Sequence, residues 1–186
     1  MVLRYRVTLS GIKGFYRVYN ISPDASLYDF HKQMRSDMDF PQDQLILFKA
    51  LDASGGVVAR YGLFDLGSGT VDSVTMADTV AAGVVSFVYF YDVTNRKSVN
   101  ISFEGEIEGV PVPGFPTVVD TKGPDPIDFE NGYVAYEDLP DEQRHLPGEA
   151  GWEDEDEDDE DLEEEEEEEE DGSEDGEEIY DASEGV

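Results

Sequence analysis

The sequence predicts an α+β domain with a mixed or antiparallel sheet and one main amphipathic helix, followed by a disordered acidic tail. Residues 2–9 and 98–103 alternate between apolar and polar side chains, the period of a strand with one buried face. Apolar residues at helical spacing lie between these runs, in residues 27–38. The last 34 residues contain 24 acidic side chains and no Lys or Arg, a composition typical of a solvated segment.

The first predicted elements form a hairpin. Residues 10–14 contain two glycines and predict a turn. Residues 15–21 then predict the returning strand, which pairs with residues 2–9. The apolar face of the first strand consists of Leu3, Tyr5, Val7 and Leu9.

A helix is predicted to begin after Ser26. Ser26 is a favourable N-cap residue, and Asp29 three residues later completes a variant of the capping box. Pro41 is expected to end the element, because proline disrupts a helix interior. The residues predicted to share the apolar face are Leu27, Phe30, His31, Met34 and Met38.

Further strands and a short helix are predicted in the middle of the chain. Thr75 is expected to begin the helix, which reaches about Ala82. Residues 84–91 are apolar on both faces, which places them centrally in the sheet. Pro116 restricts its segment to a sheet edge. The predicted strands are 45–51, 57–59, 84–91, 98–103 and the edge strand 115–119.

Charge divides the chain into a nearly neutral front and a polyanionic back. The whole chain carries a net charge of −34, and its last 34 residues carry −24. Residues 1–122 hold 14 acidic and 11 basic side chains. We therefore predict a folded α+β domain over residues 1–120, an irregular proline-containing segment over 121–152 and a disordered polyanionic tail over 153–186.

Composition argues against several classes of protein. The chain has no cysteine, which excludes disulfides and thiolate metal sites. Its first residues lack the apolar stretch of a secretory signal, and no apolar run approaches the roughly 20 residues that span a bilayer. We therefore expect a soluble cytoplasmic protein, without a cofactor or a metal ion.

The preferred function is that of a non-enzymatic interaction protein. Lys and Arg are scattered along the sequence, so direct nucleic-acid binding is not expected. The folded domain would dock on a protein partner, and the tail would screen or compete for a basic, nucleic-acid-binding surface of that partner. One alternative is a small-ligand-binding domain or an enzyme with an unrecognised pocket, and another is a tail that only adds solubility.

Several motifs between residues 3 and 104 follow a known order. They are Leu9-x-x-Ile12, Tyr16-Arg17, Leu27-x-x-Phe30-His31, Leu45-x-x-Phe48 and Tyr89-Phe90-Tyr91-Asp92. In order and spacing they resemble the plasmid pRiA4b ORF-three-like family, whose members are also described as passenger proteins of insertion elements and are named after resolvases. The resemblance implies an α+β fold and a mobile-element or cytoplasmic context, and it implies no established reaction.

The chain departs from this family after Asp92. Members carry a Gly-Asp-x-Trp-x-His stretch there, whereas residues 93–98 contain no Gly, Trp or His. The later Cys-Pro-Pro segment of the family corresponds to residues 123–126, which contain no Cys. We therefore expect no metal or polar site of the kind that those residues would form.

Three residues of the folded part are candidates for a pocket or docking site. Arg17 could clamp a carboxylate or phosphate, or pair with an Asp in a structural role. His31 could be a ligand or base, although its place on an apolar helix face favours a structural histidine. Asp92 could line a pocket or close a hairpin turn through its side chain. We identify no catalytic residue.

The acidic tail contains one adjacent apolar pair, Ile179 and Tyr180. An apolar anchor flanked by acidic residues is typical of a short docking motif for a basic, grooved partner. The alternative is that two apolar residues stand there by chance. We therefore name this pair as a candidate docking motif on compositional grounds.

Overall fold

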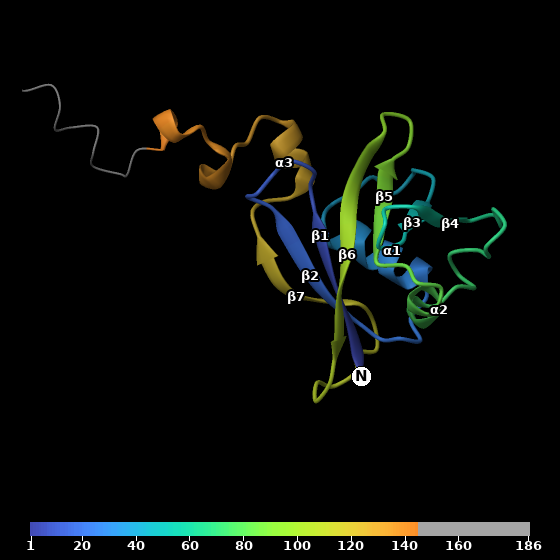
Figure 1. Cartoon of the computed structure of the whole chain (residues 1–186). Helices are drawn as coiled ribbons and strands as arrows, with labels where there is room; N and C mark the ends of the chain where they lie inside the picture. The colour runs from blue at the N-terminus through green and yellow to red at the C-terminus, as the bar shows by residue number, and fades with distance from the viewer. Residues whose placement is uncertain (145–186) are drawn as a thin grey trace, which may run out of the picture. The chain divides into compact units, whose positions relative to one another are not determined.

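Seven strands form one antiparallel sheet in the computed structural model, which describes residues 1–144 (Figure 1). The strands are β1 (Val2–Thr8), β2 (Tyr16–Ile21), β3 (Leu47–Leu51), β4 (Val57–Gly62), β5 (Ser86–Asp92), β6 (Lys97–Ile107) and β7 (Thr117–Lys122). Their order across the sheet is β4-β3-β5-β6-β1-β2-β7, and every pairing is antiparallel. The predicted α+β class with an antiparallel sheet is confirmed.

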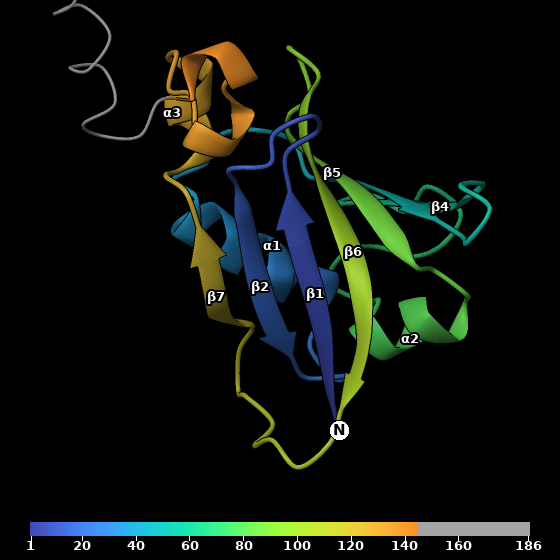
Figure 2. The same ribbon diagram turned by 60° about the vertical axis from the view of Figure 1, so that its left-hand side comes forward.

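Two helices begin where the sequence predicts them. The main helix, α1 (Leu27–Asp37), lies against one face of the sheet (Figure 2). Ser26 caps it through the predicted box, because its hydroxyl accepts the Asp29 N–H while the Asp29 carboxylate accepts the Ser26 N–H. The short helix α2 (Met76–Ala81) begins at a second capping box, in which Thr75 is the N-cap.

Aromatic side chains fill the space between α1 and the sheet. Phe30 of α1 packs edge to face on Tyr19 of β2, with ring centroids 5.2 Å apart. Each large apolar side chain contributes about 1.5–3 kcal/mol when it is fully buried. The largest fully buried side chains include Tyr5, Tyr19, Tyr89, Phe15, Phe30, Phe48 and Phe87. Because they come from α1 and from several strands, one core joins the helix to the sheet.

The folded part continues beyond the boundary predicted at residue 120. That boundary lies inside β7, which pairs with β2 at the edge of the sheet. The predicted edge strand is therefore present, although it lies closer to the C-terminus than expected. The compact unit ends at Arg144. The remaining elements are the helix α3 (Pro126–Glu130) and the 3-10 turns η1 (Tyr136–Asp138) and η2 (Asp141–Gln143).

None of the helices in residues 1–144 is long and apolar enough to cross a membrane. The predicted polyanionic tail, residues 153–186, lies outside the described residues.

Candidate functional site

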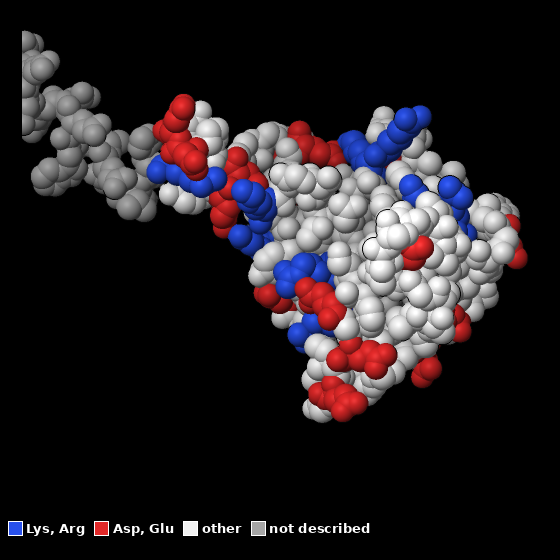
Figure 3. Space-filling model, viewed as in Figure 1, with Lys and Arg blue, Asp and Glu red and all other residues white. Residues whose placement is uncertain are grey.

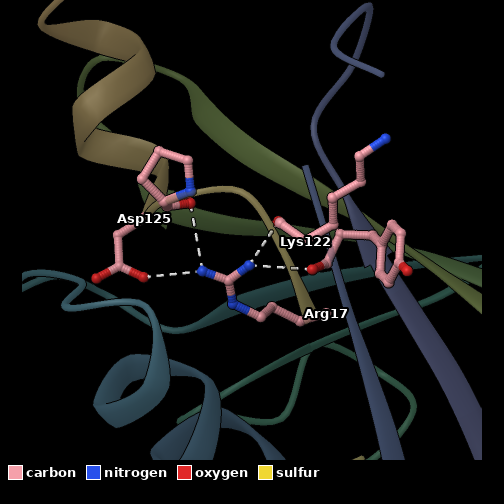
Figure 4. Close-up of polar contacts among 5 residues, drawn as sticks. Arg17, Lys122 and Asp125 are labelled. Carbon is pink, nitrogen blue, oxygen red and sulfur yellow. Dashed lines mark hydrogen bonds and ion pairs between the residues drawn. The ribbon is translucent and has the colours of Figure 1, made fainter. Parts of the chain in front are cut away.

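Arg17 is buried on β2 and holds the segment that follows β7 (Figure 4). Its Nη1 donates to the carbonyl oxygens of Lys122, at 2.8 Å, and Tyr16, at 3.0 Å. Its Nη2 donates to the carbonyl of Pro124, at 3.2 Å, and to the carboxylate of Asp125, at 3.1 Å. An internal carboxylate therefore neutralises this buried cation, as the structural alternative for Arg17 requires.

Two glycines allow the backbone to approach closely around Arg17. A Cβ atom at Gly14 would lie 2.0 Å from the Cβ of Ala135. Gly123 has φ +74°, and a Cβ atom there would lie 2.1 Å from the carbonyl oxygen of Gly14. Asp138 completes the contact, because its carboxylate accepts the backbone N–H groups of Lys13 and Gly14 at 2.7 and 2.9 Å. We call this packed region the Arg17 junction.

Asp92 closes the β5–β6 hairpin. Its Oδ1 accepts the backbone N–H of Asn95 at 3.0 Å, and its Oδ2 accepts the Asn95 side-chain amide at 2.7 Å. These hydrogen bonds, the side-chain one first, lower the pKa of Asp92. The side chain therefore has the local turn role that the sequence offered as an alternative to a pocket.

His31 lies elsewhere, in a cleft of about 490 Å³ between α1 and the connection from α1 to β3. Its side chain makes no hydrogen bond with Arg17 or Asp92, so the structure does not bring the three predicted residues into one site. The cleft has the size of a small-ligand pocket. We call it the cationic cleft, and its lining residues are Tyr28, His31, Lys32, Arg35, Ser36, Gln42, Gln44, Ile46 and Leu63.

Arg35 is the second buried arginine of the domain, and 5% of its surface is exposed. Its Nη1 donates to the Gln42 carbonyl at 2.8 Å, and its Nη2 donates to the Gln44 carbonyl at 2.7 Å. Its Nε approaches the Tyr89 hydroxyl at 3.4 Å. No carboxylate of residues 1–144 lies within 4.0 Å of the guanidinium. The positive charge of Arg35 is therefore buried without a negative partner in the described part.

His31 is neutral in this environment. Burial first, and then the charges of Arg35 and Lys32, lower the pKa of His31 to about 4. Its Nδ1 lies 2.9 Å from the Tyr89 hydroxyl. Because the Arg35 Nε–H points to the same hydroxyl, we assign the Tyr89 O–H as the donor to Nδ1. This assignment places the imidazole proton on Nε2, which has no hydrogen-bond partner within residues 1–144.

The rim of the cationic cleft carries a further cation, Lys32. Its ammonium lies 3.2 Å from the Asp29 carboxylate and 4.9 Å from the centre of the Tyr28 ring. Asp29 is absent from the cleft lining, which contains no Asp or Glu. The cleft therefore presents hydrogen-bond donors and positive charge, which suit an anion. Its lining has no carboxylate that could act as a general base.

An apolar groove adjoins the cleft and shares Ile46 and Leu63 with it. The groove has a volume of about 180 Å³, and Phe64, one of its lining residues, is 79% exposed. Its lining residues are Leu45, Ile46, Leu47, Gly62, Leu63, Phe64, Leu66 and Val93. The loop after β4 is held by Asp65, whose Oδ1 accepts the N–H groups of Gly67 and Gly69 at 2.7 and 2.9 Å. Local hydrogen bonds thus order a loop whose apolar side chains remain exposed.

Charge is scattered on the face seen in Figure 3, where uncharged surface predominates near β4 and the loop that follows it. Within residues 1–144, Arg6 pairs with Glu104, Lys97 with Glu130 and Lys122 with Glu137. No group of three or more His, Asp or Glu side chains in this part could hold a metal ion.

Sequence reasoning missed Arg35 and the exposed apolar side chains of the loop after β4. Arg35 stands four residues after His31, so helical spacing alone would have placed both on one face. Leu63, Phe64 and Leu66 are apolar residues within a glycine-rich segment, a signal of exposed apolar surface. The candidate pair Ile179 and Tyr180 lies outside the described residues.

Comparison with known proteins finds a likeness among solved structures. No family model matches the chain, and no curated protein matches it. A crystal structure of MM3350, a protein of unknown function from Methanosarcina mazei Go1, is similar with a TM-score of 0.54 and 18% sequence identity. The match covers 70% of this chain and 78% of that chain. It supports the fold and indicates no activity, so the pRiA4b ORF-three-like resemblance stays a prediction.

Proposed function

We propose that this chain is a non-enzymatic interaction protein. Its folded domain docks on a protein partner through the apolar groove, and its acidic tail screens or competes for a basic, nucleic-acid-binding surface of the same partner. The observation that carries this proposal is the exposed apolar groove in a chain whose last 34 residues contain 24 acidic side chains. We place this activity in the cytoplasm, because a chain without cysteine suits a reducing compartment.

The groove has the features of a docking surface. Leu45 is 65% exposed, Phe64 79% and Leu66 56%, and these side chains are contiguous with the groove. Contiguous exposed apolar side chains are uncommon on monomers and mark interaction sites. Phe64 is an exposed aromatic side chain in this lining, and aromatic side chains often anchor interfaces.

The tail determines the chemistry of the partner. A segment with a net charge of −24 is attracted to basic surfaces, and its polyanionic character imitates a nucleic-acid backbone. When two binding segments belong to one chain, the first contact raises the effective concentration of the second. The groove would thus bring the tail to a basic channel of a nucleic-acid-handling protein, such as one belonging to a mobile element.

A second candidate function is a small-ligand-binding domain. The cationic cleft favours it, because a pocket of about 490 Å³ is lined by convergent polar groups. The two candidates use neighbouring surfaces, and they differ in their dependence on the tail.

Affinity capture from the native cytoplasm tests the first candidate. We compare the full chain with a version that ends at Trp152, each at low and high salt. The proposal predicts basic, nucleic-acid-binding proteins that are recovered only with the tail and lost at high salt, because screening weakens exposed charge contacts. Recovery of the same proteins with and without the tail contradicts the competitor role. Lower solubility as the sole effect of truncation supports the solubility alternative.

A matched pair of variants tests the groove. Phe64→Ser removes the exposed anchor, whereas Phe115→Ser removes a phenylalanine that is 70% exposed on the connection from β6 to β7. We expect Phe64→Ser to weaken partner capture about tenfold or more, as loss of an anchor does, and Phe115→Ser to leave it unchanged. Equal effects of the two variants would contradict docking through the groove.

A further inference from the structure

The cationic cleft contains a buried charge that the described part of the chain does not neutralise. Arg35 is 5% exposed and contacts two backbone carbonyls and one hydroxyl, with no carboxylate within 4.0 Å in residues 1–144. A buried ion is costly unless an opposite charge and hydrogen bonds compensate it. Arginine also carries more N–H donors than these three contacts use. An anion that entered the cleft would supply the opposite charge that residues 1–144 do not place beside Arg35.

We propose that the cationic cleft binds an amphipathic monocarboxylate, a small molecule with one carboxylate on an apolar body. The carboxylate lies between Arg35, Lys32 and the Nε2–H of His31, and the apolar body lies along Ile46 and Leu63. This inference concerns the ligand-binding candidate alone and depends neither on the tail nor on a protein partner.

The charge balance of the cleft selects a monoanion. Asp29 already pairs with Lys32, and His31 is neutral, so Arg35 supplies the one positive charge without a partner in residues 1–144. One carboxylate neutralises that charge, whereas a phosphate dianion would bring an excess negative charge into a partly desolvated cleft. The planar guanidinium also matches the planar carboxylate in its hydrogen-bond geometry.

The shape of the cleft selects an apolar body. Ile46 and Leu63 line both the cationic cleft and the apolar groove, so the polar end opens directly onto an apolar surface. Leu63 is 50% exposed, and an apolar ligand body would cover it. A ligand with a charged head and an apolar body thus contacts both ends of this continuous surface.

Hexanoate is a suitable probe, and the imidazole signals of His31 report its binding by NMR in the full chain. Hexan-1-ol has the same carbon chain without the charge, and acetate has the charge without the chain. We expect a saturable shift of the His31 signals with hexanoate, about tenfold weaker binding of acetate and inorganic phosphate, and no saturable shift with hexan-1-ol. The chain contains one other histidine, His145, so a His31→Gln variant identifies which signals belong to His31.

Three variants test the assigned contacts. Arg35→Gln removes the unpaired charge and should weaken hexanoate binding about tenfold or more. Lys32→Gln changes an exposed side chain, and we expect it to weaken hexanoate binding about threefold. Because this variant should fold normally, it keeps the test valid if Arg35→Gln does not fold. Leu63→Ser should reduce the preference for hexanoate over acetate. The matched control is Arg60→Gln on β4, outside the cleft lining, which should bind normally.

Specific results would overturn the proposal. These are the absence of a saturable His31 shift with hexanoate, an equal shift with hexan-1-ol, and unchanged affinity in the Lys32→Gln and Arg35→Gln variants. Tighter binding of phosphate than of hexanoate would overturn the monocarboxylate assignment. Because no partner protein is present, these outcomes are independent of the capture experiment that tests the interaction function.

Discussion

Arg17 and Arg35 are both buried, yet the chain compensates their charges differently. Arg17 is 6% exposed and pairs with the Asp125 carboxylate. Arg35 is 5% exposed and meets only carbonyl and hydroxyl oxygens among its polar contacts in residues 1–144. The Arg17 junction therefore contains its own counter-charge, whereas no carboxylate of residues 1–144 pairs with Arg35 in the cationic cleft. Burial alone therefore does not distinguish a structural arginine from a binding one, whereas the presence of a partner charge does.

The largest expected loss of unfolding free energy comes from breaking the ion pair between Arg17 and Asp125. Arg17→Met removes the donor to three carbonyls and leaves Asp125 without its cation, so we expect unfolding free energy to fall by about 3–4 kcal/mol. Asp125→Asn leaves the Arg17 charge without a carboxylate, and we expect a smaller loss of about 2 kcal/mol, because the Asp125 side chain is 36% exposed and the carbonyl contacts remain. Chemical denaturation of both variants measures the difference. Equal losses would contradict the central role of Arg17.

A steric clash at Gly123 should disrupt the Arg17 junction without changing its charge. In Gly123→Ala the new methyl group meets the Gly14 carbonyl oxygen at 2.1 Å, and φ of +74° is itself unfavourable for alanine. We expect a loss of about 3 kcal/mol and faster amide exchange in β7. The matched control is Gly109→Ala, with φ +76° but no atom within 4 Å, which should lose about 1 kcal/mol. A loss in the control as large as in Gly123→Ala would show that conformation, not packing, dominates.

The cleft should make stability depend on pH through His31. Its folded-state pKa of about 4 lies below the usual value near 6.5, so the unfolded chain binds the proton more tightly. His31 therefore removes stability as pH falls from about 6.5 to 4, by roughly 2–3 kcal/mol once solvent screening in an open cleft is allowed for. A His31→Gln variant should reduce this pH dependence, as measured by denaturation at several pH values. An NMR titration of His31 with a midpoint near 6.5 would contradict the argument.

The smallest expected loss of unfolding free energy follows substitution of Arg35, the buried arginine that has no carboxylate partner in residues 1–144. Arg35→Met releases the Gln42 and Gln44 carbonyls, but it also removes an unneutralised charge from a buried position. We expect a loss of about 1–2 kcal/mol without ligand, clearly less than for Arg17→Met. Denaturation of the two variants side by side tests the ranking. A loss equal to that of Arg17→Met would mean that the protein already compensates the Arg35 charge.

Local chemistry made much of the fold predictable. The capping boxes at Ser26 and Thr75 and the apolar run at 84–91 depend on residues close in sequence, and the structure contains the corresponding elements. The compact unit extends beyond the boundary predicted near residue 120, because Arg17 holds the end of β7 from more than a hundred residues earlier in the chain. A local sequence pattern does not indicate a contact between residues so far apart in the chain.

The candidate site was less predictable for the same reason. His31 was identified, but Arg17 and Asp92 belong to other parts of the fold. The importance of Arg35 depends on which carboxylates lie near it in space, and its neighbours in sequence do not reveal that. Charge balance becomes visible only when the packed side chains are known.

The measurement that tests the comparison most directly follows the arginine Nε–H signals of the isotope-labelled full chain during a hexanoate titration. Our account predicts a saturable shift of the Arg35 signal, because the ligand carboxylate binds its guanidinium, and an unchanged Arg17 signal, because Asp125 already occupies that position. Equal shifts at both arginines, or no shift at Arg35, would contradict it.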